Sequence, residues 1–174
     1  TGHGAHDDRG HYLQLAQGKL YRDEIKQLME SKGARLNVLI TDCCNVRSDG
    51  QMFFAPAPML NPPNSITPLF RSLFIANQGW VDINGSSPGQ GAYFTRDVER
   101  LGYGSLFTSE LTSFWDKHQR QSVTWDFLVR EVGLRVSVAF KTQYPAGVAA
   151  AKGMPAQTEQ NVYAVAYPGM PENR

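Results

Sequence analysis

The chain has 174 residues, enough for one domain with a sizeable buried core, and its 41% hydrophobic and 19% charged residues are typical of a globular protein. Its 17 basic and 16 acidic residues give a net charge of +1. Binding to the phosphates of a nucleic acid requires a clear excess of basic residues, so we expect no nucleic acid partner. No apolar run approaches the roughly 18 residues of a membrane helix, so we expect no membrane partner.

The N-terminal third predicts a loop, a helix and a buried strand, in that order. Residues 1–4 are loop-like, so we expect the chain to start at a processed or truncated end from which the first strands are missing. Residues 21–32 carry apolar side chains at helical spacing, and Gly33 follows as a terminator. Residues 36–41 are a short apolar run rich in branched side chains, which is typical of a buried parallel strand.

The remaining elements alternate between strands and helices. Prolines cluster between positions 56 and 68, so residues 45–77 are predicted to be a long proline-rich loop with neither helix nor central strand. A strand is predicted at 80–84, followed by a glycine- and serine-rich loop at 85–91. Helices are predicted at 108–117 and 124–140, the second capped by Thr124, and a last strand at 162–167. This order indicates one α/β domain over residues 1–174.

Two adjacent cysteines, Cys43 and Cys44, follow the predicted strand at 36–41. A disulfide between neighbours is strained, so the pair does not indicate a disulfide framework. Cys44 can attack a carbonyl if an imidazole accepts its proton, or if the two groups rest as thiolate and imidazolium. His3 is the candidate imidazole, and the N–H groups of Gly4 and Cys44 are candidate donors to an oxyanion.

We expect His3 and Cys44 to meet in space although they are far apart in sequence. Open parallel sheets bind ligands at the carboxyl ends of their strands. His3 would follow a strand that is missing from the chain, and Cys44 follows the next strand along. Two neighbouring parallel strands would therefore present both side chains at the same edge.

Four ordered segments are similar to segments of one enzyme family. Thr1-Gly2-His3-Gly4 resembles its Ser-Gly-His-Gly element, and residues 39–45 resemble its Asp-x-Cys segment, in a register that selects Cys44 over Cys43. Residues 84–93 resemble its next strand-end loop, and residues 104–111 resemble its Gly-x-Phe-Thr-x-x-Leu helix start. The chain thus resembles the caspase-like cysteine peptidases, and metacaspases most closely. Asn45-Val46-Arg47 departs from the family's His-Ser-Gly.

The resemblance implies a mostly parallel caspase-like sheet flanked by helices in three layers. It implies a cysteine endopeptidase that cleaves after Arg or Lys and uses no cofactor for the chemistry, with Ca²⁺ as a candidate activator. Asp42 would hold the basic side chain by paired charge-assisted hydrogen bonds, and the alternative for Asp42 is a loop or helix cap. The implied substrate-binding residues are Asp42, Thr1, Ser86 and Ser87.

The expected partners are a peptide or protein substrate and an upstream segment or chain that completes the fold. Arg47 and Arg71 flank the proline-rich segment and are candidate sites of autoprocessing. A cytoplasmic location is our expectation.

The remaining titratable residues are assigned to the surface. No recognised metal spacing is present, so no metal site is predicted, and a solvated loop is preferred over calcium binding by Asp7, Asp8 and Asp49. Surface positions are predicted for the histidines outside the dyad: His6, His11 and His118.

Two other functions compete with the peptidase. An N-terminal nucleophile hydrolase would use Thr1, but such enzymes need a strand directly after the threonine, and residues 2–8 do not read as one. A catalytically inactive caspase-like module would instead bind or scaffold a partner.

Overall fold

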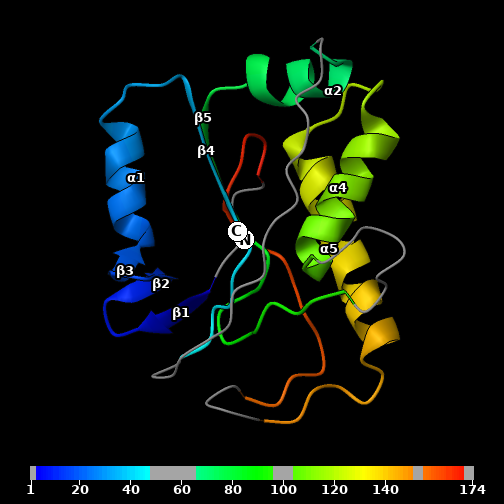
Figure 1. The fold of residues 1–174 in the computed structure, drawn as a ribbon. Coiled ribbons are helices and arrows are strands. Elements are labelled where there is room, and N and C mark those ends of the chain that lie inside the picture. Colours follow the sequence, from blue (N-terminus) through cyan, green and yellow to red (C-terminus); the bar gives the residue numbers. More distant parts are fainter. Residues whose placement is uncertain (1–2, 48–65, 96–103, 151–154, 171–174) are drawn as a thin grey trace.

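The computed structural model describes residues 3–47, 66–95, 104–150 and 155–170 (Figure 1). The strands are β1 (Gly4–Asp7), β2 (Gly10–Leu15), β3 (Gly18–Tyr21), β4 (Leu36–Thr41), β5 (Gly79–Asn84) and β6 (Tyr163–Ala166). The helices are α1 (Arg22–Glu30), α2 (Pro68–Phe70), the π-helical turn η1 (Arg71–Ile75), α4 (Leu106–His118) and α5 (Trp125–Gln143).

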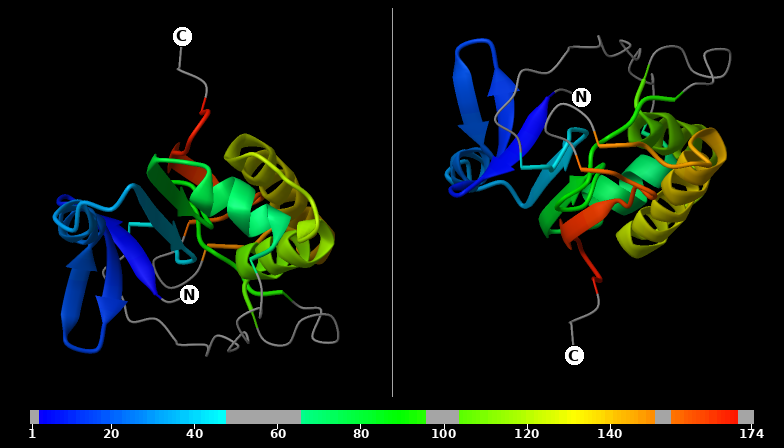
Figure 2. Two further views of the ribbon diagram at one scale, coloured as in Figure 1. Left: turned by 90° about the horizontal axis from the view of Figure 1, so that it is seen from above. Right: turned by 90° about the horizontal axis from the view of Figure 1, so that it is seen from below.

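The protein is an α/β structure, as predicted, in which a small sheet lies between helices. The sheet has the order β4-β5-β6, and Figure 2 shows α1 on one of its faces and α4 with α5 on the other. β4 and β5 are parallel, whereas β6 runs antiparallel to β5. The expectation of a mostly parallel sheet is therefore wrong for the described strands, because β6 returns beside β5 in the opposite direction.

A second sheet, which the sequence reasoning missed, connects His3 to α1. β1, β2 and β3 form an antiparallel meander with two-residue turns at 8–9 and 16–17. Each turn is followed by a glycine with positive φ, Gly10 at 137° and Gly18 at 142°, a conformation that favours glycine. The interpretation of residues 2–8 as strand-free is therefore wrong, since β1 begins at Gly4. The glycine spacing was the available signal.

The prediction of a loop over residues 45–77 is wrong at its C-terminal end, where α2 and η1 form a helical segment. Thr67 caps this segment by accepting from the N–H of Phe70 at 3.2 Å. Pro68 occupies the first helical turn, where its missing N–H costs nothing because that group has no intrahelical partner. The clustered prolines at positions 56–63 lie outside the described residues. None of the helices within the described ranges is long and apolar enough to cross a bilayer.

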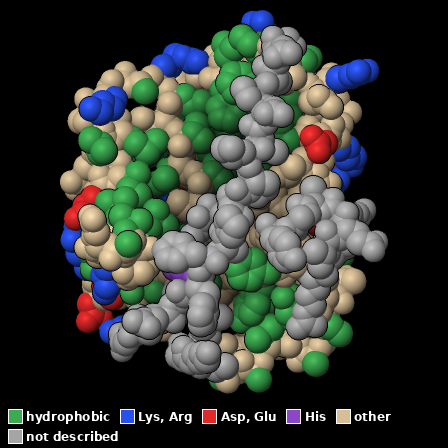
Figure 3. Space-filling model, in the orientation of Figure 1, with side chains coloured by type: hydrophobic (Ala, Val, Ile, Leu, Met, Phe, Trp, Pro, Cys, Tyr) green, Lys and Arg blue, Asp and Glu red, His purple; other side chains and the backbone are tan. Residues whose placement is uncertain are grey.

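The main hydrophobic core lies between β5 and the helices α4 and α5. Val81 and Ile83 face this core, together with buried side chains of both helices and of η1. The hydroxyls of Ser105 and Thr124 cap α4 and α5, which confirms the predicted cap at Thr124. The face shown in Figure 3 has hydrophobic side chains over its middle and Lys and Arg at its rim.

The opposite face of β5 is polar and binds α1 through a buried ion cluster. The Asp82 side chain is 2% exposed and pairs with Arg22 and with Lys26, whose Nζ lies 3.0 Å from Oδ2. Arg22 also donates to the Thr41 hydroxyl on β4. α1 contains no fully buried residue, so these charges contribute much of its attachment to the sheet.

We predict that Asp82→Asn lowers the free energy of unfolding by about 3–5 kcal/mol, because it leaves the cations of Arg22 and Lys26 without their buried carboxylate. Urea denaturation followed by circular dichroism measures the change. Asp8→Asn is the matched control, since Asp8 forms an ion pair with Arg47 at the surface, with a side chain 88% exposed. Equal stability of the two variants would contradict the prediction.

Candidate active site

Cys44 lies just beyond the end of β4, beneath the backbone of Gly91–Tyr93, which we call the strap. Its residue is 8% exposed, and its Sγ accepts from the N–H of Ala92 at 3.3 Å. Gln157 holds the strap from the other side through two hydrogen bonds with the backbone of Gly91, at 2.7 and 3.1 Å. The strap therefore covers the sulfur and supplies one donor to it.

The structure brings the segments of His3 and Cys44 together, although by a different route from the one predicted. A Cβ added at Gly4 would lie 2.7 Å from Cys43 Sγ and 2.9 Å from the Cys44 carbonyl oxygen. The N–H of His6 donates to the carbonyl of Val46 at 2.8 Å. The junction thus comes from β1 running beside the chain that leaves β4, rather than from two neighbouring parallel strands.

The N–H of Gly4, one of the two groups predicted to bind an oxyanion, is directed away from the β1–β2 ladder. The Gln14 N–H donates to the carbonyl of His3, so Gly4 stands at a non-hydrogen-bonded pair of the β1–β2 ladder. Its N–H therefore points to the same side as that of His6, which faces the segment after Cys44. Among the described residues, no backbone carbonyl accepts from the N–H of Cys44.

Burial favours the uncharged form of both members of the predicted dyad. Desolvation lowers the pKa of His3 below its ordinary value, which favours the neutral imidazole. Desolvation also raises the pKa of Cys44, and the hydrogen bond from the Ala92 N–H offsets this only in part. Of the two resting states considered from the sequence, the electrostatics favour neutral thiol with neutral imidazole.

Asp42 is buried, at 7% exposure, and the two oxygens of its carboxylate have different surroundings. Oδ2 accepts from the hydroxyls of Ser105, which is the N-cap of α4, and of Thr108 in the first turn of that helix. Oδ1 has no hydrogen-bond partner in the described part of the protein and faces Gly85, where an added Cβ would lie 2.9 Å away. This oxygen is as fully covered as the Ser86 side chain, so a cationic ligand would reach it only after the loop at Gly85 moves.

The hydroxyls of Ser86 and Ser87 bond to the backbone of the protein itself. Ser86 is fully buried, and its Oγ donates to the carbonyl of Cys43 at 2.8 Å, so it offers no surface to a substrate. The Ser87 Oγ donates to the carbonyl of Asn161 at 3.2 Å. Thr1, the other residue predicted to bind substrate, lies outside the described residues.

His11 is a site residue that the sequence reasoning missed. Its Nε2 lies 3.1 Å from the Cys44 carbonyl oxygen and 3.5 Å from Cys43 Sγ. The surface assignment is therefore wrong for His11, and also for His118, which is 5% exposed, whereas His6 is exposed as predicted. Because side chains alternate along β2, His11 lies on the face opposite to that of the buried Tyr12 and contacts the segment after β4.

No group of three or more His, Cys, Asp or Glu that could hold a metal occurs within the described residues. The carboxylates considered for calcium are engaged otherwise: Asp7 accepts from Lys19 and Tyr21, and Asp8 pairs with Arg47. Asp49 lies outside the described residues.

We predict that iodoacetamide alkylates Cys44 faster than Cys43, and that the rate at Cys44 rises with pH through a midpoint above 9, the ordinary thiol value. Cys43 is 1% exposed and its pKa is raised to about 12 by burial, so it stays protonated over the same range. Mass spectrometry of the alkylated peptide distinguishes the two positions. A midpoint near pH 6 would instead indicate a thiolate–imidazolium pair.

We also predict that Gly4→Ala lowers stability and alters the alkylation rate of Cys44, because the new methyl group overlaps Cys43 and the Cys44 carbonyl. Gly133→Ala is the matched control. Its nearest neighbour is 3.9 Å away and it lies inside α5, so it should stabilise the protein by about 0.5–1 kcal/mol. Thermal unfolding and alkylation rates measure both variants, and a silent Gly4→Ala would contradict the close packing.

Comparisons with known proteins add no relative to this picture. No protein-family model matches the chain, and a search of curated proteins finds no match. The chemistry of the site is therefore argued from its own residues.

Proposed function

We propose that the protein is a cysteine endopeptidase that hydrolyses peptide bonds after Arg or Lys. The single observation that carries the substrate class is the buried Asp42, which precedes Cys44 by two residues and whose Oδ1 has no hydrogen-bond partner among the described residues. A guanidinium or ammonium group would supply both the missing donor and the compensating charge. The sequence resemblance to metacaspases points in the same direction.

The proposed chemistry is acyl transfer through Cys44. His3 accepts the thiol proton as the sulfur attacks the carbonyl carbon, and the carbonyl oxygen becomes an oxyanion beside the N–H groups of Gly4 and Cys44. As the oxyanion collapses, the C–N bond breaks and His3 returns the proton to the leaving amine. Water, deprotonated by His3, then hydrolyses the thioester and regenerates the thiol. No cofactor takes part in these steps.

The neutral state of the dyad is consistent with this order of events. A neutral His3 is ready to accept a proton, and a protonated Cys44 avoids placing a thiolate beside the buried Asp42, whose charge raises the pKa of that thiol. A cationic side chain bound at Asp42 would remove this repulsion. Binding of the correct substrate would thus favour the thiolate that attacks it.

We further propose that the α/β structure is the core of a caspase-like three-layer fold, completed by an upstream segment or chain. The resemblance of four ordered segments supports this, as does the position of His3 and Cys44 on adjoining segments. Arg47 and Arg71 remain candidate autoprocessing sites, and both side chains are exposed. Ca²⁺ remains a candidate activator.

A binding module is the second candidate, and one observation favours it. Cys44 is covered by the strap and its thiol is protonated, which is the state of an inert cysteine. In that case the site would bind a basic peptide at Asp42 without cleaving it. The Thr1 hydrolase stays as a third candidate, tested by Thr1→Ala.

The test is hydrolysis of fluorogenic peptides ending in Arg, Lys or Asp by the full natural chain, with and without Ca²⁺. We predict cleavage after Arg and Lys that disappears in Cys44→Ala, whereas Cys43→Ala keeps measurable cleavage. Asp42→Asn, which retains an acceptor for the hydroxyls at α4, should lower kcat/KM for the Arg peptide about ten- to hundred-fold.

The other outcomes separate the competing functions. Cleavage only after Asp would retain the dyad but contradict the role of Asp42. Binding of the Arg peptide without hydrolysis would identify a binding module. Cleavage that survives Cys44→Ala but not Thr1→Ala would identify the threonine hydrolase.

A further inference from the structure

We propose that Ser86 and Asn84 are positioning residues that orient and polarise the Cys43–Cys44 peptide, so that its N–H serves as a strong oxyanion donor. The inference rests on the proposed function, because it assigns a role within the acyl transfer at Cys44. It does not assign either residue a contact with substrate.

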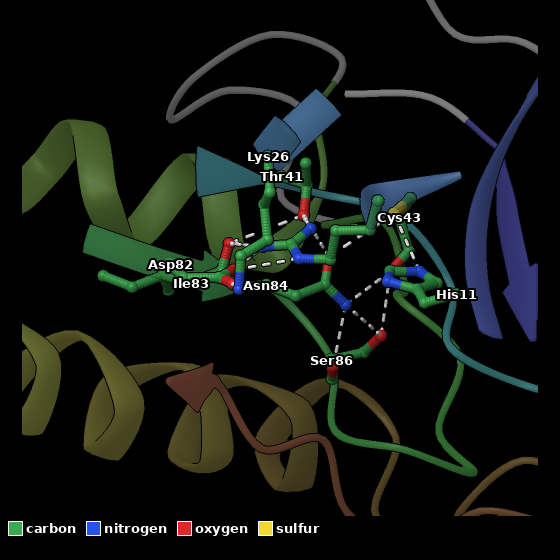
Figure 4. Close-up of polar contacts among 9 residues, drawn as sticks. His11, Lys26, Thr41, Cys43, Asp82, Ile83, Asn84 and Ser86 are labelled. Atoms are coloured by element: carbon green, nitrogen blue, oxygen red, sulfur yellow. Dashed lines mark hydrogen bonds and ion pairs between the residues drawn. The ribbon is translucent and has the colours of Figure 1, made fainter. Parts of the chain in front are cut away.

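Two side chains donate to one carbonyl directly behind the nucleophile. The Cys43 carbonyl accepts from Ser86 Oγ at 2.8 Å and from Asn84 Nδ2 at 3.1 Å. Both donors are buried, with Ser86 at 0% and Asn84 at 1% exposure. Figure 4 shows Asn84 and Ser86 converging on Cys43 from the end of β5 and the loop after it. Both lone pairs of this oxygen are thus occupied by the protein.

The carbonyl of Cys43 and the N–H of Cys44 belong to the same rigid peptide unit. In a trans peptide these groups point in opposite directions within one plane, so holding the oxygen also directs the hydrogen. Donation to the carbonyl withdraws electron density through the amide resonance, which makes the N–H on the far side a stronger donor. Ser86 and Asn84 therefore act on the oxyanion from a distance through one peptide bond.

The next peptide is held from the other direction. The carbonyl of Cys44 lies 3.1 Å from His11 Nε2 on β2, which can donate when this nitrogen carries the proton. Successive carbonyls on either side of the Cys44 α-carbon are therefore anchored to different sheets. This leaves the Cys44 backbone little freedom to rotate its N–H away from a substrate.

Asn84 is itself fixed, which makes the arrangement specific. Its Oδ1 accepts from the Thr41 hydroxyl at 2.8 Å, so the amide is oriented with the nitrogen toward the Cys43 carbonyl. Thr41 in turn accepts from Arg22 of the buried ion cluster. The chain of contacts explains why a fully buried serine and asparagine sit at the carboxyl end of β5, where apolar side chains would pack at lower cost.

The test uses two probes that differ only in their need for an oxyanion donor. A tripeptide aldehyde ending in argininal adds to Cys44: the S–C bond forms, the carbonyl π bond breaks, and the thiol proton passes to His3, leaving an oxyanion at the N–H groups. Iodoacetamide alkylates the same sulfur by displacement of iodide and generates no oxyanion. The ratio of the aldehyde affinity to the alkylation rate therefore reports on the N–H of the Cys43–Cys44 peptide rather than on the reactivity of the thiol.

For Ser86→Ala we expect the inhibition constant of the aldehyde to rise about ten-fold and kcat/KM for the Arg peptide to fall about ten-fold, with KM little changed. The alkylation rate of Cys44 should change by less than about two-fold. Ser72→Ala is the matched control, since this hydroxyl also donates to a backbone carbonyl, that of Leu69 at 3.0 Å, but lies in η1. It should leave both probes unaffected.

Asn84→Leu provides a second variant of similar volume in case Ser86→Ala does not fold, with the melting temperature recorded for each. Unchanged aldehyde affinity in a folded variant overturns the inference alone. Equal loss of aldehyde binding and alkylation also overturns it, because that would indicate general disorder of the site. Failure of the unmodified protein to bind the aldehyde overturns the proposed function, and the inference with it.

Discussion

The buried carboxylate of Asp82 is the constraint on which the rest of the site depends. A charge at 2% side-chain exposure on the central strand must be compensated, and Arg22 and Lys26 of α1 provide the compensation. Arg22 uses its remaining N–H groups on the Thr41 hydroxyl and on the carbonyl of Ile83. One ion pair thus joins α1 to both parallel strands at the end from which Cys44 emerges.

A continuous series of polar contacts connects this ion cluster to the peptide bond between Cys43 and Cys44. Thr41 donates to Asn84, and Asn84 with Ser86 donates to the carbonyl of Cys43. These contacts lie on the α1 face of the sheet, while the opposite face carries the apolar core against α4 and α5. The alternation of β5 therefore separates two tasks: Val81 and Ile83 stabilise the fold, and Asp82 and Asn84 shape the site.

The same burial that orders the site also suppresses its reactivity at rest. Desolvation raises the pKa of Cys44 and lowers that of His3, which favours the uncharged form of both groups. Asp42 adds to the cost of a thiolate because its carboxylate lies close by and is only half satisfied, at Oδ2. If the proposed function is correct, a basic residue bound at Asp42 would remove this repulsion and favour the Cys44 thiolate.

The elements that the sequence alone determined are those whose signal is local. Residues 36–41, 80–84 and 162–167 are strands within about one residue at each end, and the helices at 106–118 and 125–143 begin at hydroxyl caps, because hydrophobic period and capping act over a few neighbouring residues. The pairing of His3 with Cys44 as a catalytic dyad stays a prediction from the resemblance of short motifs.

What only the tertiary structure decided is which side chains far apart in sequence meet. The short β1–β3 meander could not be predicted from the hydrophobic pattern, because its strands are mostly polar or bounded by glycine. The contact of His11 with the Cys44 carbonyl depends on this meander and was therefore also not predicted. The sequence also could not predict that Ser86 is buried against the Cys43 carbonyl or that Asp42 accepts from the hydroxyls of α4. The partners of a buried polar group come from the elements that the fold packs beside it, which can lie far away in the sequence.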